Sequence, residues 1–193
     1  MKKRIALIAL LLAIQCGITM VNADTQTTQQ MQYISTIQAQ GLKYDSFGFM
    51  QAIINNNALL TEDFIKAGMS PKTTWGKVPA IYTAINCGSD KALKVLLSNG
   101  VNPNTLISGE SPLKIAIGKK QPQIVDILIA YGADVNASTN NESPLNYALK
   151  KKQIKIATSL LNAGAQVNDE TLVRAVKTKD NAIKDAVLRQ YKK

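Results

Sequence analysis

The sequence predicts an all-α solenoid of about five repeats, each made of a helix, a short turn, a second helix and a long loop. Three markers recur every 32 residues and stay in phase. The first marker is an alanine, at Ala52, Ala84, Ala116 and Ala148. Twelve residues later comes a large apolar residue, at Phe64, Leu96, Leu128 and Leu160, and four residues after that a glycine, at Gly68, Gly100, Gly132 and Gly164. Self-similarity at such a period predicts stacked units, because one helix pair cannot bury its apolar faces alone.

Residues 1–23 have the composition of a secretory signal peptide. Three basic residues precede an apolar run over residues 5–14, and Val-Asn-Ala at 21–23 offers small or aliphatic side chains to a signal peptidase. We expect cleavage after Ala23 and a periplasmic or secreted protein. The apolar run is shorter than the roughly 20 residues of a membrane span, so no transmembrane span is expected. Ala13 and Gln15 depart from the pattern that precedes a lipidated cysteine, which disfavours a lipoprotein at Cys16.

Residues 24–43 form a polar segment rich in Thr and Gln. Such a composition is typical of a flexible tether. Met31, Ile34 and Ile37 are spaced by three, however, and could lie on one face of a helix that caps the first repeat. We prefer the helix.

The repeat domain is predicted over residues 44–191. Its units lie at about 44–74, 75–107, 108–139, 140–168 and 169–191, and the two terminal units are atypical caps. The third unit shows the pattern best: Ser111 is a good N-cap, and Pro112 follows at the first helical position. The second helix opens at Pro122, and Gly132 supplies the left-handed residue that ends it. The fifth unit is shorter, with Ala175 and Val187 again twelve residues apart.

Two stretches, "SPLKIA…VDILIAYGADVNA" and "SPLNYA…ATSLLNAGAQVN", resemble the ankyrin repeat. The stretch "AINCGSDKALKVLLSNGVNPN" at 84–104 fits as well, and the resemblance covers roughly residues 44–191. Tetratricopeptide repeats have a similar period but lack the Gly-x-x-Val-Asn ending. This sequence departs from the family where a histidine normally follows the leucine and ties the inner helix to the loop: Tyr82, Lys114 and Asn146 stand there. Asn141 stands near the place of an expected loop glycine, and asparagine tolerates a positive φ.

The composition argues against catalysis. The chain has no histidine, which excludes Ser-His and Cys-His nucleophile pairs and histidine metal sites. It shows no phosphate-binding loop, dinucleotide fingerprint or cysteine cluster. Glu110 and Glu142 recur just before a helix start, where a carboxylate favours the helix dipole. We therefore predict no enzyme, with no catalytic residue, no metal, no cofactor and no small-molecule substrate.

The resemblance implies a protein partner held in a concave groove, which loop tips and the solvent side of the first helices line. The groove positions should fall two and three residues after each repeat alanine. The predicted partner-binding residues are Trp75, Asn86, Cys87, Ser108, Lys119, Asn140, Lys150, Lys151 and Lys177. Trp75 is either a loop aromatic packed on the stack or a binding anchor. Cys87 is either a small apolar filler or a functional thiol.

Charge divides the chain in two. The net charge is +10, and removing residues 1–23, which contain three basic residues and no acid, leaves +7. All of that excess lies in residues 114–193. We expect a monomer that binds an unidentified protein with an acidic patch, without specific nucleic-acid binding. The alternatives are electrostatic binding to an anionic polymer or membrane surface, and a solvated basic face that only aids solubility.

Overall fold

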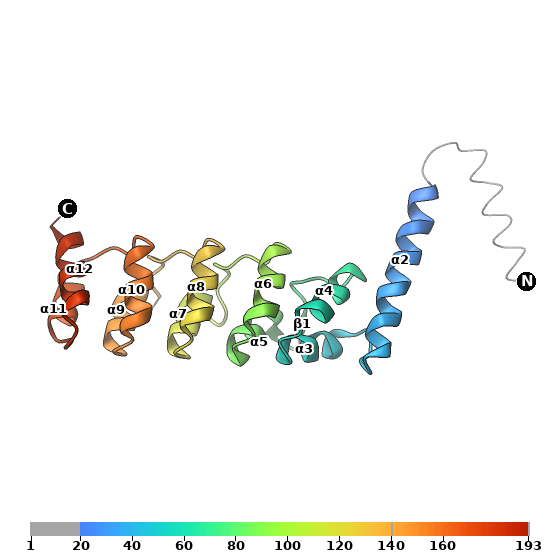
Figure 1. Ribbon diagram of the computed structural model, residues 1–193, viewed down its shortest axis with the longest axis horizontal. Coiled ribbons are helices and arrows are strands. Elements are labelled where there is room, and N and C mark those ends of the chain that lie inside the picture. Colours follow the sequence, from blue (N-terminus) through green and yellow to red (C-terminus); the bar gives the residue numbers. More distant parts are fainter. Residues whose placement is uncertain (1–19, 140, 193) are drawn as a thin grey trace, which may run out of the picture.

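A computed structural model of the chain describes residues 20–139 and 141–192. Its helix pairs lie side by side in a single row (Figure 1). The first helices of the pairs form an inner layer: α3 (Ser46–Ile54), α5 (Ala80–Cys87), α7 (Pro112–Gly118), α9 (Pro144–Lys150) and α11 (Asp169–Val176). The second helices form an outer layer: α4 (Ala58–Lys66), α6 (Asp90–Ser98), α8 (Pro122–Ala130), α10 (Ile154–Asn162) and α12 (Asn181–Tyr191). The predicted all-α solenoid is confirmed.

Each layer is built by contacts between neighbouring pairs. Inner helices contact the next inner helices, and outer helices contact the next outer ones, from one end of the row to the other. The repeat alanines are fully buried where the inner helices meet: Ala52, Ala84, Ala116, Ala148 and Ala175. The apolar residues twelve positions later are also fully buried: Phe64, Leu96, Leu128, Leu160 and Val187. The predicted phase of the repeat is therefore confirmed.

The helix ends follow the local sequence. Ser111 and Ser143 cap α7 and α9, and each accepts a hydrogen bond from the backbone N–H three residues later. The four marker glycines all have positive φ, between 83° and 103°. Asn141 has a φ of 57°, as the sequence predicts.

The N-terminal segment is helical as far as the structure describes it. Helix α2 (Met20–Ala39) packs against α4 at the N-terminal end of the row (Figure 1) and buries Ile37 fully. The predicted signal peptide lies largely outside the described residues, which begin inside it at Met20. No helix within the described ranges is long and apolar enough to cross a membrane.

The long loops are tied to one another by asparagines of the Gly-x-x-Val-Asn ending and its variant in the second repeat. Asn104 donates to the carbonyl of Gly132 at 3.0 Å and accepts from the N–H of Asp134 at 2.8 Å. Asn136 repeats this bridge one unit later, with the N–H of Gln166 at 2.7 Å from its side-chain oxygen. These bridges fix the spacing of successive loops.

The loop tips are short hairpins. β1 (Thr74–Trp75) pairs antiparallel with β2 (Val78–Pro79), which is the only two-stranded sheet among the described residues. Single bridges join Ile107 to Glu110 and Thr139 to Glu142 at the equivalent places of the next two loops. We define the groove face as these loop tips together with the exposed ends of the inner helices. The tips lie beside the inner helices and form one edge of this face.

Candidate functional site

The described residues that the sequence assigns to binding are exposed on the groove face. Asn86 and Cys87 end α5, Lys119 follows α7, Lys150 and Lys151 lie at the end of α9, and Lys177 follows α11. Ser108 is exposed at a loop tip with a φ of 53°. Asn140 lies outside the described residues.

Trp75 belongs to an exposed aromatic pair at the N-terminal end of the groove face. The residue is 53% exposed, and its ring lies 5.5 Å from that of Phe47, which is 49% exposed. Phe47 stands near the start of α3, a position that the repeat pattern marks as neither core nor groove. Sequence reasoning missed Phe47 because the contact joins two units. Large aromatic side chains that remain half exposed are frequent anchors in protein interfaces.

A cavity of about 700 Å³ occupies the middle of the groove face. It brings together two predicted binding residues, Ser108 and Lys119. Its further lining includes Val78, Tyr82, Ile107, Lys114 and Tyr147, so the wall is largely aromatic and aliphatic.

Tyr147 crosses this cavity from α9 toward α7. Its ring lies 5.4 Å from the ammonium groups of both Lys114 and Lys151. A Cβ atom at Gly118 would lie 3.3 Å from the Tyr147 hydroxyl oxygen, so the glycine leaves room for the ring. The two ammonium groups close to the ring make this part of the groove face at once aromatic and positive.

Two of the residues at the family's histidine position make hydrogen bonds beyond their own helix: Lys114 bonds to a loop, and Asn146 bonds to helix α11. Lys114 is 5% exposed, and its Nζ donates to the carbonyl of Thr139 at 2.6 Å. Asn146 donates to the Glu170 carboxylate at 3.0 Å and accepts from the Thr171 hydroxyl at 2.7 Å. The lysine and the asparagine that stand in place of the family's histidine therefore still connect their inner helix to another segment of the chain. The sequence could not show this, because the partners stand 24 and 25 residues away.

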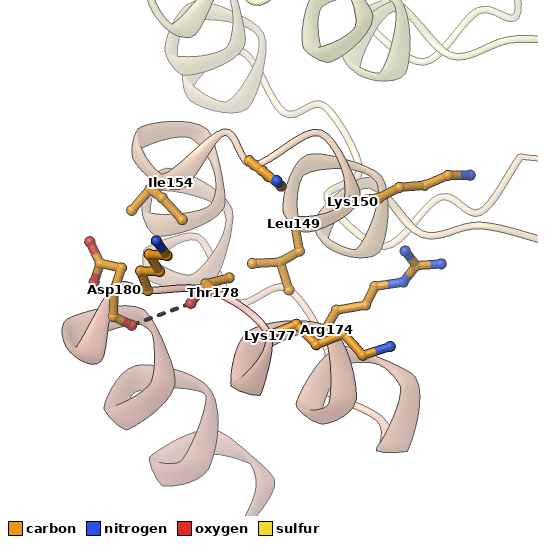
Figure 2. Close-up of a pocket in the computed structure, with 9 residues that line it drawn as sticks. Leu149, Lys150, Ile154, Arg174, Lys177, Thr178 and Asp180 are labelled. Atoms are coloured by element: carbon orange, nitrogen blue, oxygen red, sulfur yellow. Dashed lines mark hydrogen bonds between the residues drawn. The ribbon is translucent and has the colours of Figure 1, made fainter.

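A second cavity, of about 630 Å³, lies between the fourth and fifth helix pairs (Figure 2). It contains two further predicted binding residues, Lys150 and Lys177. The rest of its lining comes from α9 and α11, from the turns that follow them and from the first residue of α10: Leu149, Lys152, Ile154, Arg174, Thr178, Lys179 and Asp180. Trp75, Asn86 and Cys87 line neither cavity.

Glu142 pairs with one of the lysines that the sequence assigns to binding. Its carboxylate lies 3.2 Å from Lys150 Nζ and 3.6 Å from the Arg174 guanidinium. The glutamate therefore neutralises part of the charge at Lys150 rather than acting only on a helix dipole. Within the part of the chain that the structure describes, no ion pair involves Lys119, Lys151 or Lys177.

Two ionisable groups with shifted pKa values take part in the packing of the first two units. A hydrogen bond from Asn56 lowers the pKa of the Asp90 carboxyl. The same Asn56 accepts from the backbone of Lys91 and Ala92 and thereby caps α6. Burial raises the pKa of the Tyr44 hydroxyl, which donates to the carbonyl of Ala67. No cluster of three metal-ligating side chains occurs among the described residues.

Comparison with known proteins supports the fold. The chain matches the family described as "Ankyrin repeats (3 copies)" over residues 49–139 and again over residues 80–171. Among solved structures, 329 chains match. One is the ankyrin repeat domain of Bcl-3, a member of the IkappaB protein family, with 21% identity and a TM-score of 0.61, covering 74% of this chain and 67% of that one. No curated protein matches the sequence.

The chain therefore belongs to the ankyrin repeat family. Ankyrin repeats are generally protein–protein interaction modules, and their fold is typically a non-enzymatic binding scaffold.

Proposed function

We propose that the chain is an exported, non-enzymatic binding module that docks one protein partner on its groove face. The observation that carries the proposal is the composition of that face. Its N-terminal end exposes the Phe47–Trp75 pair, and its middle holds the Tyr147 ring with the ammonium groups of Lys114 and Lys151 close to it. Lys151 and Lys177 continue the positive charge toward the C-terminal end.

This arrangement favours a partner that combines an apolar contact with an acidic patch. Half-exposed aromatic rings supply contact area at a small cost in side-chain entropy. The unpaired lysines stand on successive units, so their fields partly add over a Debye length of about 8 Å at physiological salt. A partner with the opposite pattern would be oriented along the row before it makes close contact.

The export part of the proposal rests on the N-terminal sequence. Cleavage after Ala23 would leave residues 24–39 of α2 on the first unit, including the buried Ile37. N-terminal sequencing of the native protein tests this step. We expect Asp24 as the first residue, and an intact Met1 or a lipid-modified Cys16 would contradict it.

The docking part is tested by a double charge reversal on the groove face. A pull-down from an envelope fraction with mass spectrometry would first identify the partner. Lys119→Glu combined with Lys151→Glu should then slow association and flatten its salt dependence, because rim charges act mainly on the encounter rate. The matched control reverses Lys184 and Lys192, which lie on and just after α12 in the outer layer. Equal effects from both pairs would show that only net charge matters.

The excess of basic residues after position 113 also favours a second candidate, attachment to an anionic polymer or membrane surface. Salt separates the two candidates, since polymer binding weakens steeply as counterions compete. A steep loss of affinity that is insensitive to Trp75→Ala would favour this candidate over protein docking.

A further inference from the structure

The cavity between the fourth and fifth units lies beside a side chain that is shorter than the residues at the same position in the two preceding units. The position five residues after the repeat alanine holds Gln121 in the third unit, Gln153 in the fourth and Asp180 in the fifth. Gln153 reaches back to the preceding unit and donates to the carbonyl of Ile117 at 2.9 Å. Gln121 packs on the preceding turn, where a Cβ atom at Gly88 would lie 3.2 Å from its Nε2.

Asp180 does not reach back in this way. Its carboxylate accepts a hydrogen bond from the N–H of Ile183 at 3.0 Å and thereby caps its own helix, α12. The two glutamines make no such cap. The space that a glutamine would cross toward Leu149 therefore stays open, and Leu149 and Asp180 both line the resulting cavity.

The cavity combines an apolar wall with a cationic rim. Leu149 projects into its centre and Ile154 lies beside it (Figure 2). Five basic side chains surround these two residues, from Lys150, Lys152, Arg174, Lys177 and Lys179. Glu142 and Glu170 pair with Lys150 and Arg174, whereas no ion pair to a described carboxylate involves the other three lysines.

One of these unpaired lysines has an unfavourable backbone conformation. Lys152 has a φ of 58°, a left-handed conformation that glycine adopts most readily. The second unit has Gly88 at the equivalent place, with a φ of 69°. A cation is therefore present at the cavity rim where the backbone favours glycine.

We infer that this cavity is the specificity pocket of the proposed binding module, and that it takes one apolar side chain of the partner flanked by carboxylates. The inference rests on the proposed protein docking and adds the chemistry of the docked segment. The apolar side chain would lie against Leu149 and Ile154, and the flanking carboxylates would meet Lys152, Lys177 and Lys179. Lys150 and Lys177 make the pocket continuous with the groove face.

Two substitutions of Asp180 separate the effect of filling the pocket from the effect of removing the carboxylate charge. Asp180→Asn removes the carboxylate and keeps a good N-cap, so it leaves the cavity open. Asp180→Gln removes the same charge but gives a longer side chain. A side chain of this length lets Gln153 bridge to the unit that precedes it. The probe is a short fluorescein-labelled peptide with a central leucine among aspartates, and fluorescence anisotropy at low salt measures its dissociation constant.

We expect Asp180→Asn to bind the peptide about two- to fivefold more tightly, because a repulsive charge is lost. We expect Asp180→Gln to bind about tenfold more weakly than the unmodified protein, because the glutamine fills the site of the leucine. A peptide with serine in place of the leucine should bind weakly to all three proteins. Circular dichroism and urea unfolding confirm that each variant is folded.

Four outcomes would overturn the inference. Equal tightening by both substitutions would mean that charge alone attracts the peptide, as would equal affinity for the leucine and serine peptides. Failure of the unmodified protein to bind the peptide would exclude the pocket as its site. A peptide that responds to the Lys119 and Lys151 reversals but not to Asp180 would leave the groove proposal standing without the pocket.

Discussion

The first unit and the last three share one backbone pattern but fill and connect their cores differently. In the first, aromatic rings fill the core: the Phe64 ring lies 5.6 Å from that of Phe49 and 5.8 Å from that of Tyr44. In the last three, the buried hydrophobic core is aliphatic, and buried polar side chains make hydrogen bonds within a unit or to the next one. Lys114, Asn146 and Thr171 are each at most 5% exposed, and all three make hydrogen bonds.

This difference shows what the repeat requires and what it leaves free. The alanine at the helix contact and the glycine after the outer helix recur in each of the first four units, because they set the spacing and the turn. The large apolar position accepts either Phe64 or a leucine. The position that holds Tyr82, Lys114 and Asn146 accepts a tyrosine, a lysine or an asparagine. Charge can therefore accumulate in one half without changing the fold.

The largest effect should come from the aromatic core. Phe64→Ala should lower the free energy of unfolding by about 3–5 kcal/mol, because it removes a fully buried ring and leaves a cavity between two other rings. Leu160→Ala, at the equivalent place of the fourth unit, should cost less within the range of about 2–5 kcal/mol. Urea unfolding of both variants measures the difference. A larger loss of stability in Leu160→Ala would show that the aromatic contacts do not make the first unit more sensitive than the fourth.

An intermediate effect should come from the buried lysine. Lys114→Met keeps most of the side-chain volume but leaves the carbonyl of Thr139 without its donor, which should cost about 1–3 kcal/mol. Lys119→Met, on the exposed end of the same helix, should stay within about 0.5 kcal/mol. Denaturant midpoints of the two variants would decide. If both substitutions lowered stability by the same amount, the hydrogen bond of Lys114 would not contribute to holding the last three units together.

The smallest effect should be a gain in stability. Lys120 and Lys152 have φ values of 59° and 58°, so replacing either by glycine should raise stability by about 0.5–1 kcal/mol. The reverse change in the second unit, Gly88→Ala, should lower stability by a similar amount. Thermal unfolding would detect both shifts. A loss of stability in Lys120→Gly would mean that the lysine side chain contributes more than its backbone conformation costs.

The sequence predicted the features that repeat. The buried alanines, the N-caps at Ser111 and Ser143 and the positive φ of Asn141 all follow from local rules and from the period. The features that it did not predict are individual side-chain contacts. The contact of Phe47 with Trp75, the tie from Lys114 to Thr139 and the pairing of Lys150 with Glu142 each depend on side-chain directions that a period does not encode.

The candidate site was predicted in the same partial way. The exposed ends of the inner helices were located correctly, because they stand at a fixed offset from the repeat alanine. The cavity beside Asp180 was not predicted, although the change from Gln121 and Gln153 to Asp180 is visible in the sequence. What distinguishes Asp180 is that it lacks the hydrogen bond to the preceding unit that Gln153 makes. This difference becomes meaningful only when the partner of Gln153 is known.

The asparagine bridges between the loops also determine how the molecule would respond to force. Asn104 and Asn136 each link one unit to the next through a few hydrogen bonds, and a unit touches only its neighbours. Tension along the row would therefore load the junctions in series, and the weakest would open first. Each opening would release the chain of one whole unit while the others stayed folded, so the row would lengthen in discrete steps.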